Sequence, residues 1–199
     1  MISTEQCIKK KRSGSFVTVH HYIASSREIP TGTFGIKTKL VPISDVSDIK
    51  IKGLKSEKIK RNKYINKSNL KEQYMIVYET EENFLGITVS ELDGYDEISG
   101  KFINPFVYHL ECPHSRRGYR DLFKYINENL SDSESIELYT CLDGEELKEK
   151  DDSLDIVVNL GTNHFKNNIG NFKLDEKRLF DELSERFSFR ERQYVVVTK

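Results

Sequence analysis

The sequence has few cysteines, the residues that stabilise many small folds through disulfides or bound zinc. It holds three cysteines, Cys7, Cys112 and Cys141, which are widely spaced and odd in number. They form no CxxC pair and no disulfide framework, which argues against zinc-ribbon and disulfide-rich secreted folds. We therefore expect free thiols in a reducing, cytoplasmic setting. No basic segment followed by an apolar one opens the chain, so we expect no secretory signal.

Tryptophan, methionine and long apolar runs are also scarce. The 199 residues include no Trp, two Met and four Pro, and 37% are hydrophobic. No apolar stretch approaches the ~20 residues that a membrane helix needs, so we expect no membrane partner. Ten Tyr and eleven Phe are nevertheless enough to build a globular core, which excludes fibrous and disordered classes. The richness in Lys, Asn and Ile is typical of bacteria with AT-rich genomes or their phages.

Motifs of common enzyme classes are missing as well. The chain has no P-loop, no G-x-G-x-x-G and no G-x-S-x-G. Cys112 precedes a predicted helix, as in thiol phosphatases, but the arginine required six residues later is replaced by Gly118. We therefore expect no cofactor and favour a binding protein over an enzyme.

The charge, in contrast, is divided unevenly along the chain. The 31 basic and 32 acidic residues give a net charge of -1. Residues 1–72 carry 16 Lys and Arg against 6 Asp and Glu, a net +10, whereas residues 73–199 carry 15 against 26, a net -11. This asymmetry predicts a basic, β-rich N-terminal region over 1–72 and an acidic α+β domain over 73–199. A single sheet spanning both halves fits the pattern equally well.

Alternating or β-branched apolar runs predict most of the strands. They are expected over residues 15–23, 34–40, 74–78, 84–89, 102–110, 135–141, 154–160 and 193–197. The polar residues 79–83 predict a hairpin between the third and fourth of these strands.

Two segments have the periodicity of amphipathic helices. Ser115 is a suitable N-cap for the first, whose apolar face contains Tyr119, Leu122, Phe123, Ile126 and Leu130. The second starts at Asp175 and repeats Leu179, Leu183 and Phe187 at every fourth residue. Together with the strands, these helices predict an α+β fold: a mixed or antiparallel sheet with two amphipathic helices packed on it, preceded by a β-rich region.

The acidic segment from residue 132 to residue 155 suggests a function. It carries ten acidic residues against two lysines, and an acidic surface attracts a basic partner and speeds its capture. We predict a protein that binds a basic protein target, such as an inhibitor or immunity-type protein covering a basic toxin or nuclease site. The expected contact residues are Asp143, Glu145, Glu146, Asp151 and Asp152.

Two other functions stay open at this point. Residues 50–71 contain nine basic residues and one acidic residue, Glu57, so this basic segment is a candidate for nucleic-acid binding. Its expected contacts are Lys58, Lys60, Arg61, Lys63 and Lys67.

The second alternative is a metal-dependent hydrolase. His109 and Glu111 share one face of a predicted strand, and His114 follows in the turn before the helix. These residue types bind transition metals, and a metal with an open position activates water. His20, His21 or His164 would supply a further ligand.

Overall fold

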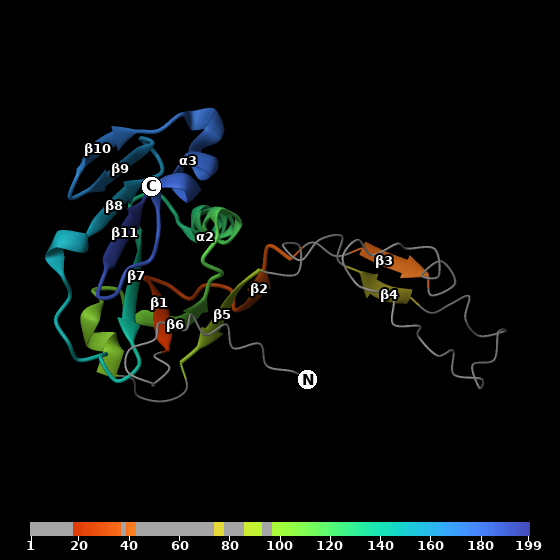
Figure 1. The fold of residues 1–199 in the computed structure, drawn as a ribbon, viewed down its shortest axis with the longest axis horizontal. Coiled ribbons are helices and arrows are strands. Elements are labelled where there is room, and N and C mark those ends of the chain that lie inside the picture. Colours follow the sequence, from red (N-terminus) through yellow and green to blue (C-terminus); the bar gives the residue numbers. More distant parts are fainter. Residues whose placement is uncertain (1–17, 37–38, 43–73, 78–85, 93–96) are drawn as a thin grey trace, which may run out of the picture. The chain divides into compact units, whose positions relative to one another are not determined.

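The computed structural model describes residues 18–36, 39–42, 74–77, 86–92 and 97–199. Contacts divide the chain into two compact units, Met1–Ile36 with Leu85–Lys199, and Lys37–Phe84. In the smaller unit, β3 (Lys39–Pro42) pairs antiparallel with β4 (Tyr74–Val77) (Figure 1). The other described elements belong to the larger unit.

A nine-stranded mixed sheet, of order β10-β9-β8-β11-β7-β1-β6-β5-β2, organises the larger unit. Its strands are β1 (Val19–Ser25), β2 (Gly32–Phe34), β5 (Ile87–Glu91), β6 (Phe106–Glu111), β7 (Ser135–Leu142), β8 (Ile156–Asn159), β9 (His164–Asn167), β10 (Gly170–Lys173) and β11 (Tyr194–Thr198). Neighbouring strands are antiparallel except β8 and β11, which are parallel.

Strand β1 lies inside this sheet, between β6 and β7. Five of its seven residues are buried, as expected for a strand with neighbours on both sides. It comes from the basic N-terminal region, whereas β6 and β7 come from the acidic region, so one sheet contains strands of both. The boundary expected at residue 72 lies outside the described residues.

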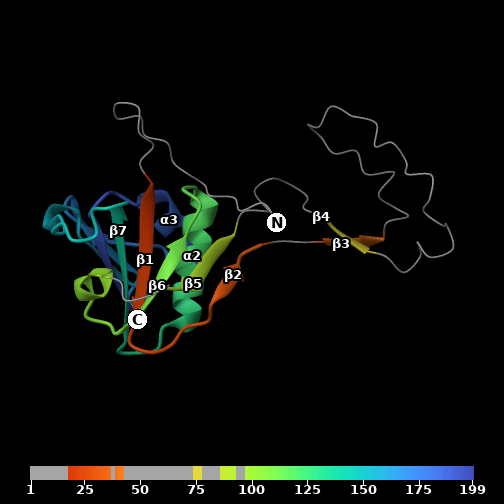
Figure 2. The ribbon, with the colours of Figure 1, turned by 90° about the horizontal axis from the view of Figure 1, so that it is seen from below.

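The α-helices of the described part are α2 (Arg116–Asn129) and α3 (Leu179–Arg186). Short 3-10 helices occur at η3 (Glu97–Lys101), η4 (Asp152–Leu154) and η5 (Glu176–Arg178). Helix α2 lies alongside β6 and β5 (Figure 2), and α3 packs beside it on the same face of the sheet. The predicted α+β class is confirmed.

The start of α2 follows the predicted capping chemistry. The Ser115 side chain accepts a hydrogen bond from the Gly118 backbone N–H at 3.1 Å, which satisfies one of the free amides of the first turn. A Cβ atom at position 118 would lie 2.2 Å from the Pro113 carbonyl oxygen. Glycine is therefore required for this helix to begin so close to the end of β6.

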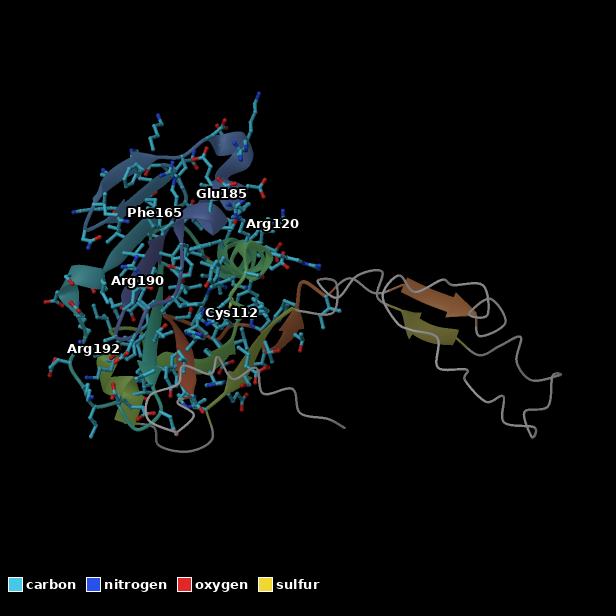
Figure 3. The ribbon with its side chains drawn as sticks, viewed as in Figure 1. Cys112, Arg120, Phe165, Glu185, Arg190 and Arg192 are labelled. Atoms are coloured by element: carbon cyan, nitrogen blue, oxygen red, sulfur yellow. The ribbon has the colours of Figure 1, made fainter. Side chains whose placement is uncertain are left out.

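The helix-covered face holds the larger core. The predicted apolar face of α2 is buried there, together with Leu183 of α3 and Phe187, the residue that follows α3. Ion pairs link the two helices at their exposed edges, where Arg120 bonds Asp181 at 3.1 Å and Arg116 pairs with Glu185 at 3.5 Å. Figure 3 labels Arg120 on α2 and Glu185 on α3.

The opposite face has a smaller aromatic core, formed by Tyr22, Tyr139 and Tyr194 with Ile98 of η3. Buried Glu137 anchors the segment that follows η3. It accepts hydrogen bonds from the Asn104 N–H at 2.9 Å and from the Tyr194 hydroxyl at 2.5 Å. The carboxylate is thus satisfied by donors, as a buried charge requires.

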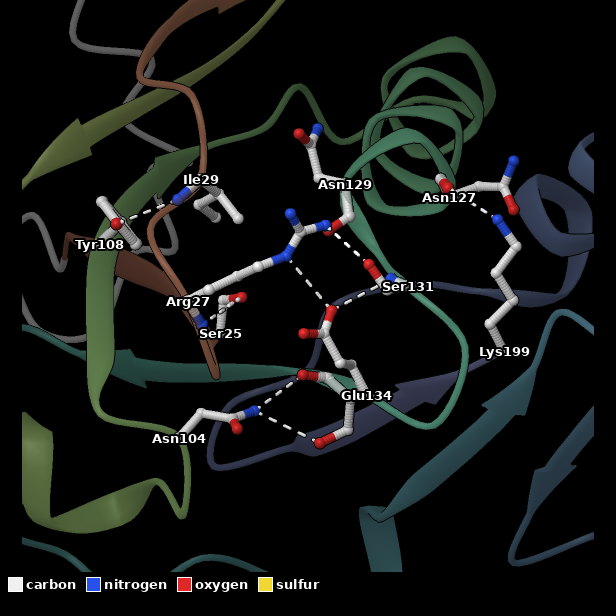
Figure 4. A network of polar contacts seen from close by, with 11 residues as sticks. Ser25, Arg27, Ile29, Asn104, Tyr108, Asn127, Asn129, Ser131, Glu134 and Lys199 are labelled. Carbon is white, nitrogen blue, oxygen red and sulfur yellow. Dashed lines mark hydrogen bonds and ion pairs between the residues drawn. The ribbon is translucent and has the colours of Figure 1, made fainter.

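Polar contacts fasten the connections at the ends of strands. Arg27, just after β1, donates to the Asn129 carbonyl and the Ser131 hydroxyl, both at 3.0 Å, and pairs with Glu134 (Figure 4). The pKa of Glu134 is lowered, mainly by the hydrogen bond from the Ser131 N–H and then by Arg27. This network joins the β1–β2 connection to the turn between α2 and β7.

Two predictions about the strands are wrong, one on the extent of a strand and one on a pairing. Residues 34–40 do not form one strand, because β2 ends at Phe34 and Gly35 has a positive φ of 79°. The hairpin expected between 74–78 and 84–89 is also absent: β4 pairs with β3, whereas β5 pairs with β2 and β6. The polar link 79–83 has no glycine to specify a tight turn, so partners distant in sequence decide the pairing.

Other elements differ from their predicted bounds by only a few residues or were absent from the prediction. Residues 102–103 precede β6 instead of belonging to it, and the hairpin of β9 and β10 was not predicted. The remaining expected strands match β1, β6, β7, β8 and β11 within the described residues. No helix of the described part is long and apolar enough to cross a membrane.

Candidate functional site

Four of the five histidines gather at one end of β1 and β6. The register places Tyr22 opposite His109 and His21 opposite Leu110. His114 lies in the turn that follows β6. Because successive residues of a strand point to opposite faces, His20 and His109 belong to the face with the smaller core, and His21 to the helix-covered face.

On the helix-covered face, His21 is buried at 4% exposure. Its Nδ1 lies 2.9 Å from the Thr140 hydroxyl, and its Nε2 lies 2.9 Å from Nε2 of His114. The ring stacks on Phe189 with centroids 4.1 Å apart. One nitrogen of the histidine pair donates and the other accepts, so the ring that accepts is neutral.

The surroundings of both rings favour their neutral forms. Burial, followed by the neighbouring His114, His109 and His20, lowers the pKa of His21 to about 3. Burial also lowers the pKa of His114. It raises the pKa of the buried Cys112 thiol, which keeps this cysteine protonated and a poor nucleophile. Cys112 and Cys141 are both free and buried.

On the opposite face, His20 meets carboxylates. Its Nδ1 lies 3.5 Å from Nε2 of His109 and its Nε2 lies 3.5 Å from Oδ1 of Asp143. Ligand-type atoms of His20, Asp143 and Glu146 all lie within 4.8 Å of one another. This is the one such group of three or more found among the described residues.

The acidic contact residues predicted from sequence have different environments. Glu145 pairs with Lys148 at 2.7 Å, Asp151 caps η4 by accepting from the Ser153 N–H, and Asp152 pairs with Lys150 at 3.1 Å. Hydrogen bonds lower the pKa of Glu145 and of Asp151. Asp143 and Glu146 face His20 instead, so the five residues share one segment but do not form one cluster.

The metal set predicted from sequence is not brought together. His109 lies beside His20 and Tyr22, whereas His114 contacts His21 and Phe189 on the other face. Glu111 is exposed at the end of β6. The prediction placed His109 and Glu111 correctly on a strand, but the chain turns after it and carries His114 to the helix side. His20, named as a possible extra ligand, proves to be the histidine beside the carboxylates.

The predicted nucleic-acid contacts, Lys58, Lys60, Arg61, Lys63 and Lys67, lie outside the described residues. At the start of α2, Arg117 pairs with Asp121 and bonds the Gly35 carbonyl, and Arg116 pairs with Glu185. These arginines therefore have partners within the chain.

Sequence reasoning missed the proximity of His20 to Asp143 and Glu146. These residues are more than 120 positions apart, and only the pairing of β1 with β7 unites them. No family model, curated protein or solved structure matches the chain.

Proposed function

We propose that this protein binds a basic macromolecular partner, as an inhibitor or immunity-type protein does, through residues 143–155, here called the acidic loop. The loop contains seven acidic residues and two lysines, a net charge of -5. Such a concentrated charge raises the association rate with a basic surface and suppresses binding to acidic ones.

Hydrogen bonds hold the acidic loop in place. Lys101 Nζ donates to the Leu147 carbonyl at 3.2 Å and to the Lys148 carbonyl at 2.9 Å. The Asp151 N–H donates to the Arg192 carbonyl at 3.0 Å. A surface that is already ordered loses less conformational entropy on binding, and this favours affinity.

The observation that carries the proposal is an exposed apolar side chain within this charged loop. Leu147 is 68% exposed, and Ile103, two residues beyond Lys101, is 90% exposed. Interfaces combine apolar anchors that become buried with a polar or charged rim. Asp152, whose side chain is 83% exposed, supplies part of such a rim.

A capture experiment with matched variants tests the proposal. The immobilised full chain is exposed to lysate of the cells that produce it, which is first treated with nuclease and then given excess chelator, and the retained proteins are quantified by mass spectrometry. We expect basic proteins that the wild type retains to be lost from Leu147→Ser/Asp152→Lys.

The control changes the same residue chemistry elsewhere. Ile169→Ser/Glu176→Lys alters an apolar residue that is 80% exposed and an exposed acid outside the loop, with the same change in charge. We expect this control to retain the wild-type set. Equal retention by the loop variant, or no enrichment of any basic protein by the wild type, contradicts the proposal.

A further inference from the structure

A second property of the molecule arises from His20 and two carboxylates. The β1–β7 register places His20 opposite Cys141, and the Asp143 N–H donates to the Thr18 carbonyl at 2.9 Å, which extends the pairing by one step. His20 and Asp143 are therefore diagonal neighbours on one face of the sheet. This placement follows from the fold and not from closeness in sequence.

The spacing of the ligand atoms differs from that of an ordinary ion pair. His20 Nε2 and Asp143 Oδ1 are 3.5 Å apart, longer than the ~2.7–2.9 Å of a charge-assisted hydrogen bond. Two ligands at ~2.0–2.2 Å from a tetrahedral metal ion lie roughly 3.4 Å from each other. The observed distance is thus the separation expected of two atoms that share a metal ion.

Contacts with neighbouring residues also orient the side chains of His20 and Glu146. Nδ1 of His20 faces His109, so its Nε2 points to the carboxylates; outer contacts of this kind fix the ring of a metal-binding histidine. Gly144 has a positive φ of 75°, which reverses the chain, and its N–H donates to Glu146 Oε1 at 3.3 Å. The turn thereby returns the Glu146 side chain toward His20.

We propose that His20, Asp143 and Glu146 bind one divalent transition-metal ion of the Zn²⁺ type. One imidazole nitrogen and two carboxylate oxygens suit zinc, whereas magnesium prefers oxygen ligands alone. The Asp143 side chain is 70% exposed, which leaves one coordination position open to water. This inference goes beyond the proposed function and does not rest on it.

Calorimetric titration of the chelator-treated full chain with Zn²⁺ alone tests the site. We expect one equivalent to bind. His20→Ala, Asp143→Asn and Glu146→Gln should each weaken the affinity at least about tenfold, since even outer contacts contribute about 10–100-fold. Asp143→Asn is the key variant, because it changes an exposed side chain with little change in shape. Mg²⁺ should bind far more weakly than Zn²⁺.

Two control variants separate this site from the other histidines. His114→Ala removes the exposed member of the helix-side pair, and His164→Ala removes the histidine of β9; both should retain zinc affinity. Absence of zinc binding, unchanged affinity in Asp143→Asn, or loss of binding in His114→Ala would each overturn the proposal. The capture experiment above contains chelator, so its result is independent of this one.

Discussion

His20 and His21 are adjacent in sequence but lie in opposite environments. His21 is enclosed by Thr140, His114 and Phe189 under the helices, and it is held neutral. His20 lies on the other face, half-buried, beside two carboxylates and a polar turn. The comparison shows that strand alternation places one histidine among buried groups and the next beside carboxylates.

The two faces differ in their cover as well. The helix side is closed by α2 and α3, with apolar residues packed continuously around it. The opposite side has a smaller core, covered in part by η3 and the segment after it. We therefore expect substitutions on the helix side to affect stability most, and substitutions around His20 to affect binding.

The largest effect is expected in the helix-side core. Phe123, on the buried face of α2, is fully buried, and replacing it with alanine leaves a cavity, so Phe123→Ala should lower the free energy of unfolding by about 3–5 kcal/mol. Urea denaturation followed by circular dichroism measures this change. Val157→Ala, at a position 43% exposed, should change the free energy by less than about 0.5 kcal/mol. Similar values for the two variants would contradict the assigned core.

On the opposite face, the largest loss of stability should come from substitutions that affect the buried Glu137 carboxylate. Tyr194→Phe removes the hydroxyl donor to Glu137 and should cost about 1.5–3 kcal/mol, as expected for a hydrogen bond to a buried charge. Tyr139→Phe is the matched control, since its hydroxyl makes a longer 3.4 Å contact with the Lys148 carbonyl; it should cost less. The same urea titration compares both variants, and an inverted order would show that Glu137 does not depend on Tyr194.

The pH dependence of stability should come from the helix side. The pKa of His21 is about 3 in the folded state, whereas it is about 6.5 in the unfolded chain. The contribution of neutral His21 to the free energy of unfolding is therefore complete above about pH 6.5 and is lost as the pH falls toward 3. The loss is about 1.4 kcal/mol per pH unit and amounts to about 2 kcal/mol at pH 5. His21→Gln should remove much of this slope, measured by urea denaturation between pH 7 and pH 5. His164→Ala should retain it; a slope unchanged in His21→Gln would place the titration elsewhere.

The smallest effect is expected where the helices meet solvent. The Arg120–Asp181 pair is exposed on both sides, and exposed pairs contribute about 0.2–1 kcal/mol. Asp181→Asn should therefore shift thermal unfolding only slightly, and less at high salt. A loss comparable to that of Phe123→Ala would mean that the helix pair depends on charge more than on its core.

Much of the fold could be predicted from local patterns. The cap at Ser115, the buried face of α2 and the apolar run of β11 are consequences of neighbouring residues, and each is confirmed. The prediction of a β4–β5 hairpin is wrong because each strand pairs with strands that are selected by contacts between residues distant in sequence. Alternation tells which residues share a face, but not which strand lies beside them.

The same limit applies to the site. The residue types for metal binding were visible in the sequence, but His109, Glu111 and His114 were grouped because they are neighbours in the chain. The group found in the structure needs the β1–β7 pairing and the turn at Gly144. The acidic loop was visible from composition, whereas its internal ion pairs and the exposure of Leu147 were not.

The most direct test of the contrast between the two faces is an imidazole ¹H–¹⁵N NMR spectrum of the labelled full chain at pH 7, recorded as one equivalent of Zn²⁺ is added. We expect the ring nitrogens of His20 to shift strongly, with His109 affected as its neighbour, while His21, His114 and His164 stay unchanged. Shifts of His21 and His114 with His20 unchanged would contradict the account, since they would place the binding site on the helix side of the sheet.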